Sequence, residues 1–385
     1  MTWETVPLGK IALVNPRASA SASASAGGTV TFLGMADLGE DGRTTDGTLL
    51  ASSEVKSGYT PFENLDLLVA KITPCFENGK IGQVRIPTAS GLGSTEFHVV
   101  RADVTRVDSR YLLHFLRGPR VRSLGEMRMT GSAGQKRVPV EFLRKLKVPL
   151  PPLAEQRRIA AILDEADALL TRAQAGFARF VEVRDAAFRQ STQTSATVAL
   201  GAVSRMYGGS SLPEGEPFVG QADGYLCLKV SDMNRRDNEA GIANSSSWSA
   251  SPGSRASTAP AGAVVIPKRG GAIGTNKKMQ LLRPAILDPN LMAIEADGST
   301  LLPATLLAWF KTIDLKTIQS GSSVPQLNKQ DLIPLEVPIP PLDVQGDFSL
   351  SMSELRVSEA SSRRRLVVLD SLFASLQHRA FRGEL

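Results

Sequence analysis

The sequence predicts an α+β fold in which two mixed α/β domains, related by internal duplication, are separated by two long antiparallel coiled-coil helices. A proline-rich segment occurs twice, each copy follows a region of short apolar stretches and glycine turns, and each copy precedes a long segment with helical periodicity. A matched repeat on this scale indicates duplication of a whole structural unit. The predicted domains are residues 1–152 and 193–342, and the predicted helices are residues 153–192 and 343–385.

The repeated segment reads LKVPLPPLAEQ at residues 146–156 and LEVPIPPLDVQ at residues 335–345. Its paired prolines lack backbone donors and disfavour helical backbone in the residue before them. An acidic residue follows in each copy, Glu155 or Asp343, where the positive end of a helix dipole favours negative charge. Each copy is therefore predicted to form a rigid connection in which a domain ends and a helix begins.

Within each half, short apolar runs and glycine turns indicate strands. The clearest runs, residues 65–71 and 263–268, place a lysine at the end of each strand. One helix per half is predicted, over Ser109–Leu116 and over Leu302–Thr312. This combination of elements indicates a mixed α/β module.

The two halves also begin alike, with TVPLGKI at residues 5–11 and TVALGAV at residues 197–203. Each is predicted to be a short apolar entry that ends in a turn. The first half then continues into residues 18–26, where Ala and Ser alternate. This low-complexity run is predicted to be a mobile loop.

The segments after the prolines carry apolar side chains at heptad spacing. In the first segment these are Ile159, Ala166, Ala173, Phe180 and Ala187. Such a stripe predicts packing against a partner helix, and the second segment is the economical partner in an antiparallel pair. A helix of about 36 residues spans roughly 54 Å, which exceeds the ~34–36 Å of one turn of B-DNA. The pair can therefore act as a ruler; the alternative is an oligomerisation face of a generic bundle.

The placement of charge points to the domains. The chain has a net charge of +6, yet residues 155–189 contain as many Arg as acidic residues, and so do residues 343–384. Neither helical segment contains a lysine, so the positive excess belongs to the two halves. Basic domains joined by neutral helices suggest that the domains meet a polyanion. Ordinary solubility charge is the alternative.

No catalytic, cofactor-binding or metal-binding residues are predicted. The Gly79-Lys80 pair resembles the end of a P-loop, but Ile81 replaces the Ser or Thr that would hold magnesium. No Asn-Pro-Pro-aromatic or Asp-Pro-Pro-aromatic methyltransferase motif is present, and two cysteines with three scattered histidines cannot build a conventional structural zinc site. The chain start lacks the pattern of a signal peptide and no apolar run approaches ~20 residues, so the cytoplasm is predicted.

Taken together, these features resemble the specificity subunit of type I restriction–modification systems. The resemblance is carried by Val148–Ile159, by its repeat at Val337–Gln345 and by the closing Ala380–Leu385. It implies two target recognition domains, each reading one part of a split double-stranded DNA sequence, with the helices fixing the gap. It also implies two methyltransferase subunits as partners, which hold S-adenosylmethionine and methylate adenine. Endonuclease/translocase subunits can join such a complex.

Two polar loops at matching places, Gly131–Arg137 and Gly321–Lys329, carry amides and cations that can contact base edges and phosphates. Plain surface connections are the alternative for both loops. With the resemblance, the predicted DNA-binding residues are Gln135, Lys136, Arg137, Gln326, Asn328, Lys329, Lys71, Lys80, Lys268, Arg269, Lys277 and Lys278. Two other functions stay open: a self-sufficient DNA-cleaving enzyme with an unrecognised metal site, and a tandem-domain scaffold that binds proteins.

Overall fold

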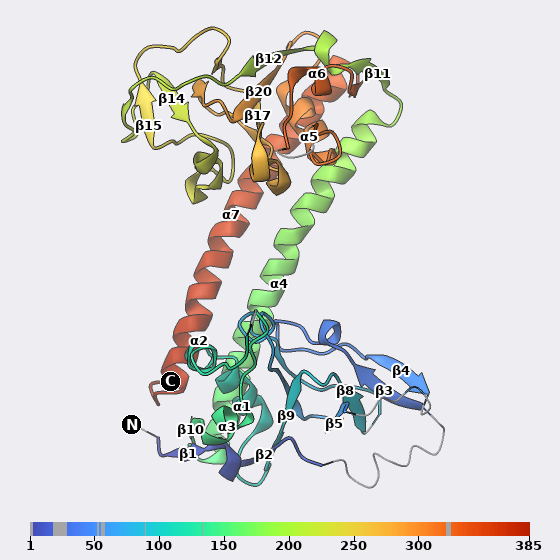
Figure 1. The fold of residues 1–385 in the computed structure, drawn as a ribbon, viewed down its shortest axis with the longest axis vertical. Helices are drawn as coiled ribbons and strands as arrows, with labels where there is room; N and C mark the ends of the chain where they lie inside the picture. The colour runs from blue at the N-terminus through green and yellow to red at the C-terminus, as the bar shows by residue number, and fades with distance from the viewer. Residues whose placement is uncertain are drawn as a thin grey trace. The chain divides into compact units, whose positions relative to one another are not determined.

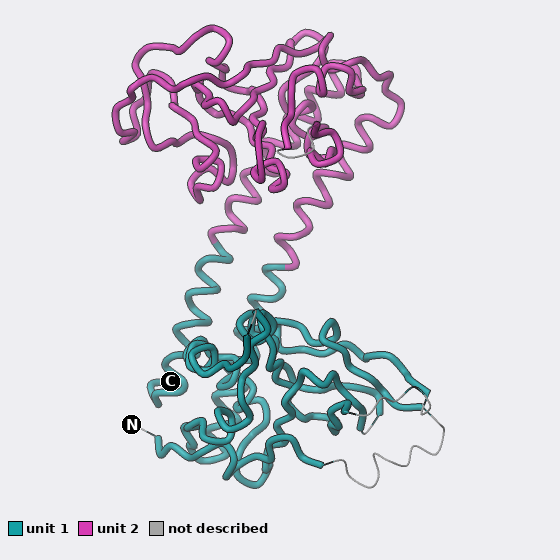
Figure 2. The backbone as a smooth tube through the Cα atoms, viewed as in Figure 1, with its two compact units in different colours: residues 1–174, 365–385 teal, residues 175–364 magenta. Residues whose placement is uncertain are grey.

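The computed structural model describes residues 3–17, 29–51, 54, 58–88, 90–132, 134–320 and 325–385. The loop predicted at residues 18–26 lies outside these ranges. The chain forms two compact units, coloured separately in Figure 2. Unit 1 comprises residues 1–174 and 365–385, and unit 2 comprises residues 175–364. Each unit therefore contains a part of both long helices.

Unit 1 contains three sheets in its described residues (Figure 1), with strand orders β2-β9-β6-β7, β4-β3-β8-β5 and β1-β10. The strands are β1 (Thr5–Pro7), β2 (Ala12–Val14), β3 (Thr29–Leu33), β4 (Thr48–Ala51), β5 (Thr60–Glu63), β6 (Leu67–Ala70), β7 (Ile81–Gln83), β8 (Ser90–Gly93), β9 (Phe97–Ala102) and β10 (Lys147–Pro149). The helices are α1 (Ser109–Leu116), α2 (Pro119–Glu126) and α3 (Val140–Lys145), with 3-10 turns η1 (Leu8–Lys10) and η2 (Met35–Asp37).

Unit 2 also contains three sheets in its described residues, with orders β12-β20-β17-β18, β13-β15-β14-β19-β16 and β11-β21. The strands are β11 (Ala196–Ala199), β12 (Ser204–Gly208), β13 (Glu216–Pro217), β14 (Tyr225–Leu228), β15 (Ser247–Ser249), β16 (Thr258–Ala259), β17 (Val264–Pro267), β18 (Met279–Gln280), β19 (Ala285–Leu287), β20 (Leu291–Ala296) and β21 (Glu336–Ile339). The helices are α5 (Pro303–Thr312) and α6 (Lys329–Leu332), with 3-10 turns η4 (Leu200–Ala202), η5 (Val230–Asn234), η6 (Arg236–Asn238) and η7 (Gly270–Thr275).

The two units share one topology, which confirms the predicted duplication. The first strand of each unit pairs with the last in an antiparallel ribbon, and each larger sheet of one unit has its counterpart in the other. Even the exception recurs: β3 pairs with β8, and β14 with β19, as parallel strands among antiparallel neighbours. The entry leucines Leu8 and Leu200 are both fully buried. Helix α2 has no counterpart among the described residues of unit 2, and strand β13 has none among those of unit 1.

The long helices are α4 (Leu153–Thr192) and α7 (Leu342–Ala380). In unit 1 the first turns of α4 bury Ile159 and Leu163 in the domain core, and Phe373 near the end of α7 packs on the same core. In unit 2 the end of α4 meets the start of α7, where the rings of Phe188 and Phe348 lie 6.0 Å apart. Within each unit, therefore, the two helices pack together in opposite directions, as the heptad stripe predicts.

A buried glutamine joins each helix start to its domain. Gln156 donates to the carbonyls of Pro151 (2.8 Å) and Arg106 (3.1 Å), and its Oε1 accepts from the amide of Asp108 (2.8 Å). Gln345 repeats all three bonds, with the carbonyls of Pro340 and Thr300 and the amide of Leu302. Both side chains are completely buried. The last residue of the Pro-Pro repeat therefore satisfies backbone groups that burial would otherwise leave unpaired.

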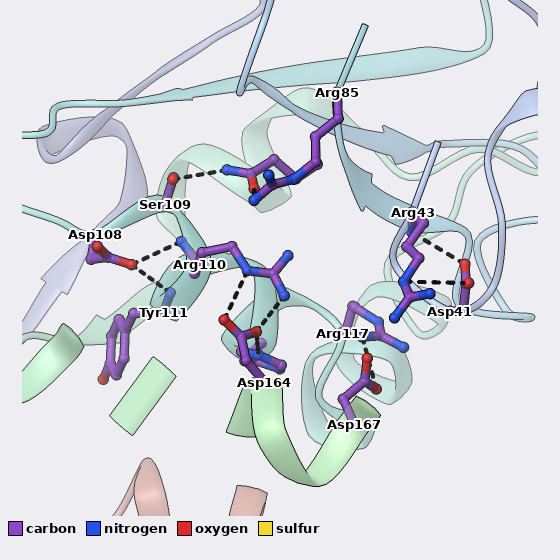
Figure 3. Close-up of polar contacts among 12 residues, drawn as sticks. Asp41, Arg43, Arg85, Asp108, Ser109, Arg110, Tyr111, Arg117, Asp164 and Asp167 are labelled. Carbon is purple, nitrogen blue, oxygen red and sulfur yellow. Dashed lines mark hydrogen bonds and ion pairs between the residues drawn. The ribbon is translucent and has the colours of Figure 1, made fainter. Parts of the chain in front are cut away.

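Unit 1 adds ion pairs between α1 and α4 (Figure 3). The guanidinium of Arg110 and the Nε2 of the buried His114 both donate to the Asp164 carboxylate, and Arg117 lies 3.4 Å from Asp167. Burial alone would raise the pKa of Asp164, but the hydrogen bonds from His114 and Arg110 outweigh it and lower the pKa to about 2. Helix α1 is thereby held on the first turns of α4.

Candidate nucleic-acid interface

Two loops that are far apart in sequence lie side by side in unit 1. Residues 71–80 follow strand β6, and residues 130–138 connect α2 to α3. Ile72 and Arg137 form an antiparallel bridge, and the amide of Val138 donates to the carbonyl of Lys71 at 2.8 Å. The Thr73 hydroxyl accepts from the amide of Lys136 at 2.8 Å. These contacts bring Lys71 together with the polar loop of Lys136 and Arg137.

Unit 2 repeats the arrangement. Arg269 and Gln326 form the equivalent bridge, and the amide of Leu327 donates to the carbonyl of Lys268 at 2.9 Å. We call residues 71–80 with 130–138, and residues 268–277 with 320–329, the paired loops of the two units; residues 133 and 321–324 lie outside the described ranges. The strand-end lysines Lys71 and Lys268 correspond, as the sequence predicts.

The register of the pairing refines the sequence comparison. Arg137 and Gln326 each bridge to the residue after the strand-end lysine, and each exchanges backbone hydrogen bonds with the start of its own loop, Thr130 or Ser320. Gln326 is therefore the structural counterpart of Arg137, and not of Gln135. The same position carries a cation in one unit and an amide in the other.

In unit 1 the loop side chains differ in how firmly they are held. Arg137 binds the Glu96 carboxylate with two nitrogens, at 3.0 and 2.8 Å, and its side chain is 41% exposed. These hydrogen bonds, with the charges of Arg137 and Lys71, lower the pKa of Glu96 although burial opposes the shift. Gln135 and Lys136 are exposed. Arg137 is thus pre-oriented, while Gln135 and Lys136 are the accessible groups.

In unit 2 the amides are linked to one another. Gln326 donates through Nε2 to Oδ1 of Asn328 at 2.7 Å, and the Asn328 amide N–H donates to Asp331 at 2.7 Å as α6 begins. Lys329 donates to the carbonyl of Met206 at 2.7 Å. The pair Gln326–Asn328 is therefore a fixed polar edge with its remaining amide groups half-exposed.

Positive charge gathers beside this edge. Burial lowers the pKa of Lys268, and the neighbouring charges of Arg269 and Lys329 lower it further. Lys268 and Arg269 are chain neighbours, and their backbone pairing with Gln326 and Leu327 brings the segment of Lys329 beside them. Such a cluster attracts phosphate groups, and the adjacent amides can bond to base edges.

Lys80, Lys277 and Lys278 are placed differently. Each donates from Nζ to a backbone carbonyl. Lys80 donates to Met35 and Lys277 donates to Met233, both at 3.0 Å, and Lys278 donates to Ile313. Lys80 and Lys277 stand at the same distance along the chain from the strand-end lysines and reach the 3-10 turns η2 and η5. They fasten neighbouring segments, and each ammonium still has a donor to spare.

Metal-ligand groups and membrane-spanning helices are both absent from the residues that the structure describes. No group of three or more His, Cys, Asp or Glu side chains in the described ranges is arranged to hold a metal ion. Among the helices of the part of the chain that the structure describes, none is long and apolar enough to cross a membrane.

Fold and site together define a duplicated α+β protein in which each unit carries basic, amide-bearing paired loops and a part of both long helices. Residues 1–175 match the family model described as the type I restriction modification DNA specificity domain. The resemblance of the chain to specificity subunits of type I restriction–modification systems is thereby confirmed.

Curated relatives agree with this family. The chain is 39% identical over 160 residues to the specificity subunits of the type I restriction enzymes EcoEI and EcoAI of Escherichia coli. Each alignment covers 41% of this chain and 26% of the relative, so the similarity spans about a quarter of the length of those proteins.

Solved structures agree over the whole fold. One is a chain from a structure of the type I R-M system, solved to explain complex assembly and conformational transition. It is 17% identical, with a TM-score of 0.55, and the match covers 100% of this chain and 98% of that chain. The S subunit of a type I restriction–modification system from M. genitalium is 14% identical, with a TM-score of 0.56, covering 99% and 96%. At these identities the likeness shows the fold.

Proposed function

We propose that this chain is a non-catalytic DNA sequence-specificity subunit of a type I restriction–modification methyltransferase/endonuclease. Each recognition domain, residues 1–152 and 193–342, reads one half of a split duplex target, and the helices set the spacing. The observation that carries the proposal is the recurrence of the paired loops: one scaffold presents cations and amides at the same place twice. Phosphate contacts position a protein on DNA and amide contacts to base edges specify sequence.

The proposed contacts divide by chemistry. Gln135, Gln326 and Asn328 are the candidates for base edges, because a side-chain amide can bond to adenine with two hydrogen bonds. The candidates for phosphates are Lys71, Lys80, Lys136, Arg137, Lys268, Arg269, Lys277, Lys278 and Lys329. Arg137 is also oriented by Glu96, so it can present its guanidinium in one fixed direction.

The proposed partners follow from the family. Two methyltransferase subunits would hold S-adenosylmethionine and methylate adenine, and endonuclease/translocase subunits would join for cleavage. In that arrangement this chain binds no cofactor itself. The cytoplasm stays the predicted compartment, since the DNA proposed as the ligand lies there.

The full chain, with and without methyltransferase subunits, should be tested for retardation of a pool of random duplexes on native gels. We expect specific complexes whose affinity falls steeply with salt. No retardation under any of these conditions would favour the protein-binding scaffold. Reproducible cleavage of DNA by the chain alone with magnesium or manganese would favour the self-sufficient enzyme.

A further inference from the structure

A groove outside the paired loops runs along the edge strand β12 of unit 2. It has a volume of about 310 Å³ and is lined by Arg205, Tyr207, Pro252, Gly253, Arg255 and Thr258. The turn that forms its other wall is fastened to the strand, because the amide of Gly208 donates to the carbonyl of Ala256 at 3.0 Å. The groove is thus built from two backbone segments that hold each other in place.

Two arginines line this groove, Arg205 on the strand and Arg255 on the facing turn. The guanidinium carbon of Arg205 lies 5.0 Å from the centre of the Tyr207 ring. Among the described residues, neither arginine has a carboxylate within ion-pair distance. The cation–π contact orients Arg205 without neutralising its charge.

Two further polar groups lie beside the arginines. Glu295, directly opposite Arg205 on the neighbouring strand β20, accepts a hydrogen bond from the Tyr207 hydroxyl. Its carboxylate keeps its charge, so two guanidinium groups face one carboxylate here. The hydroxyl of Thr258 is buried and has no hydrogen-bond partner in the described part of the chain. A bound oxygen atom or a water beside it would supply the missing partner.

The corresponding place in unit 1 gives an internal comparison. A groove of about 550 Å³ lies along the equivalent edge strand β2, and its lining includes Arg17, Arg101 and Arg144. There, however, Arg101 pairs with Asp66 and Glu63, at 2.8 and 2.7 Å, and Arg144 pairs with Glu141 at 2.8 Å. The duplicated scaffold therefore makes a groove twice. In unit 1 two of the three lining arginines have acidic partners, whereas Arg17, like Arg205 and Arg255 of unit 2, has none in the described ranges.

We propose that the β12 groove of unit 2 binds a phosphodiester of the DNA duplex, through Arg205 and Arg255, as a contact additional to the paired loops. This inference rests on the proposed function. Two guanidinium groups bind a phosphate well because their planar donors match its oxygens. The contact carries no sequence information; it positions unit 2 on the DNA.

The test compares the full-length wild-type chain with R205Q/R255Q, with the single variant R255Q, and with R236Q as the control. Arg236 is an exposed arginine of the same unit outside the groove and the paired loops. Affinity for a duplex that the wild type binds is measured at several salt concentrations. R205Q/R255Q should bind at least about tenfold more weakly to every sequence, and the slope of log K against log[salt] should fall by roughly 2. R236Q should behave as the wild type.

Two further measurements separate the outcomes. Thermal unfolding establishes that the variants fold, and R205K/R255K, which keeps the charges, should recover part of the affinity. In a second set of duplexes, single phosphodiesters are replaced by uncharged methylphosphonates. At one position the replacement should weaken DNA binding by the wild type and leave DNA binding by R205Q/R255Q unchanged. Folded variants with unchanged affinity and salt slope overturn the inference while leaving the proposed function intact. A wild type that binds no DNA overturns both.

Discussion

At the scale of single residues, the paired loops separate side chains that are held by their own domain from side chains that are free to meet a ligand. Arg137 is held by Glu96, and Gln326 is held by Asn328. Gln135 and Lys136, by contrast, are exposed. The held residues give the interface a fixed shape, and the free residues are the ones whose replacement tests recognition without disturbing the fold.

Gln135→Ala should relax discrimination in one half of the target only. If the side-chain amide makes two hydrogen bonds to a base, its loss should weaken the binding free energy for the preferred base pair by about 1–3 kcal/mol. Binding to duplexes with other base pairs at that position should change little. The measurement is relative affinity across a set of duplexes with single base changes. Gln190→Ala, at an exposed position of α4, is the control. An unchanged base preference would remove Gln135 from the proposed contacts.

Replacing Lys277 and Lys278 together by Gln should weaken binding to all sequences and reduce the salt slope by roughly 2, if both contact phosphates. Because both ammonium groups also bond to backbone carbonyls, thermal unfolding must accompany the binding data. A loss of stability with no change in the salt slope would assign these lysines to the fold alone.

At the scale of elements, the helix starts are the most strongly determined feature of each unit. The Pro-Pro pair ends the domain, and the buried glutamine binds three backbone groups of that same domain. The glutamine is therefore the residue that couples the direction of each helix to its domain. In unit 1, the ion pairs of α1 with Asp164 and Asp167 add to this coupling.

Gln156→Leu should destabilise unit 1 by about 3 kcal/mol, because it leaves two carbonyls and one amide unpaired in a buried site. Gln345→Leu should do the same to unit 2. A two-domain chain need not unfold in one step. Amide hydrogen exchange, measured separately in unit 1 and unit 2, therefore reports the destabilisation of each unit by its own variant. Gln174→Leu, at an exposed position of α4, should be close to neutral. Equal behaviour of all three variants would contradict the proposed coupling.

Asp164→Asn should make the stability of unit 1 less dependent on acid pH. The pKa of this carboxyl is lowered to about 2 in the folded chain, from 3.8 ordinarily. Its stabilisation is therefore complete above about pH 4 and is lost as the pH falls towards 2. After discounting for solvent screening, the neutral-pH loss should be about 1 kcal/mol. Denaturant titrations at pH 7 and pH 3 provide the measurement, and an equal loss at both pH values would contradict this assignment.

The sequence predicted the elements well because their signals are local. Proline pairs, heptad spacing and apolar strands made the helix starts and the duplication readable, and α1 was predicted with its observed bounds. Helices α2, α3 and α6 were missed, since only one helix per half was predicted. The sequence of α2 is polar, with a glycine next to its last residue and little apolar periodicity. Helices α3 and α6 are only six and four residues long. The role of Gln156 was also missed, since its three partners are defined only after the domain has folded.

The site was less predictable for the same reason. Arg137 and Gln326 are recognised as counterparts only from the backbone pairing between loops. The sequence around Gln135 does not show this correspondence. Lys80 and Lys277 looked like free cations, and their carbonyl acceptors lie on turns more than forty residues away. The arginines of the β12 groove carried no motif at all.

At the scale of the whole molecule, duplication provides two copies of one scaffold whose recognition side chains differ. A cation at Arg137 in unit 1 stands where unit 2 has the amide of Gln326. Since each unit would read its own half-site, the proposed target has two parts of different sequence. The long helices, which contribute to both units, would set a constant gap between those parts.

Mapping of adenine methylation in the source genome, before and after disruption of the gene for this chain, tests the proposed function most directly. We expect one methylated motif with two dissimilar defined parts and a gap of constant length, and we expect all methylation at that motif to disappear on disruption. Persistence of every methylated motif after disruption, or loss of a single contiguous motif without a gap, would contradict the account.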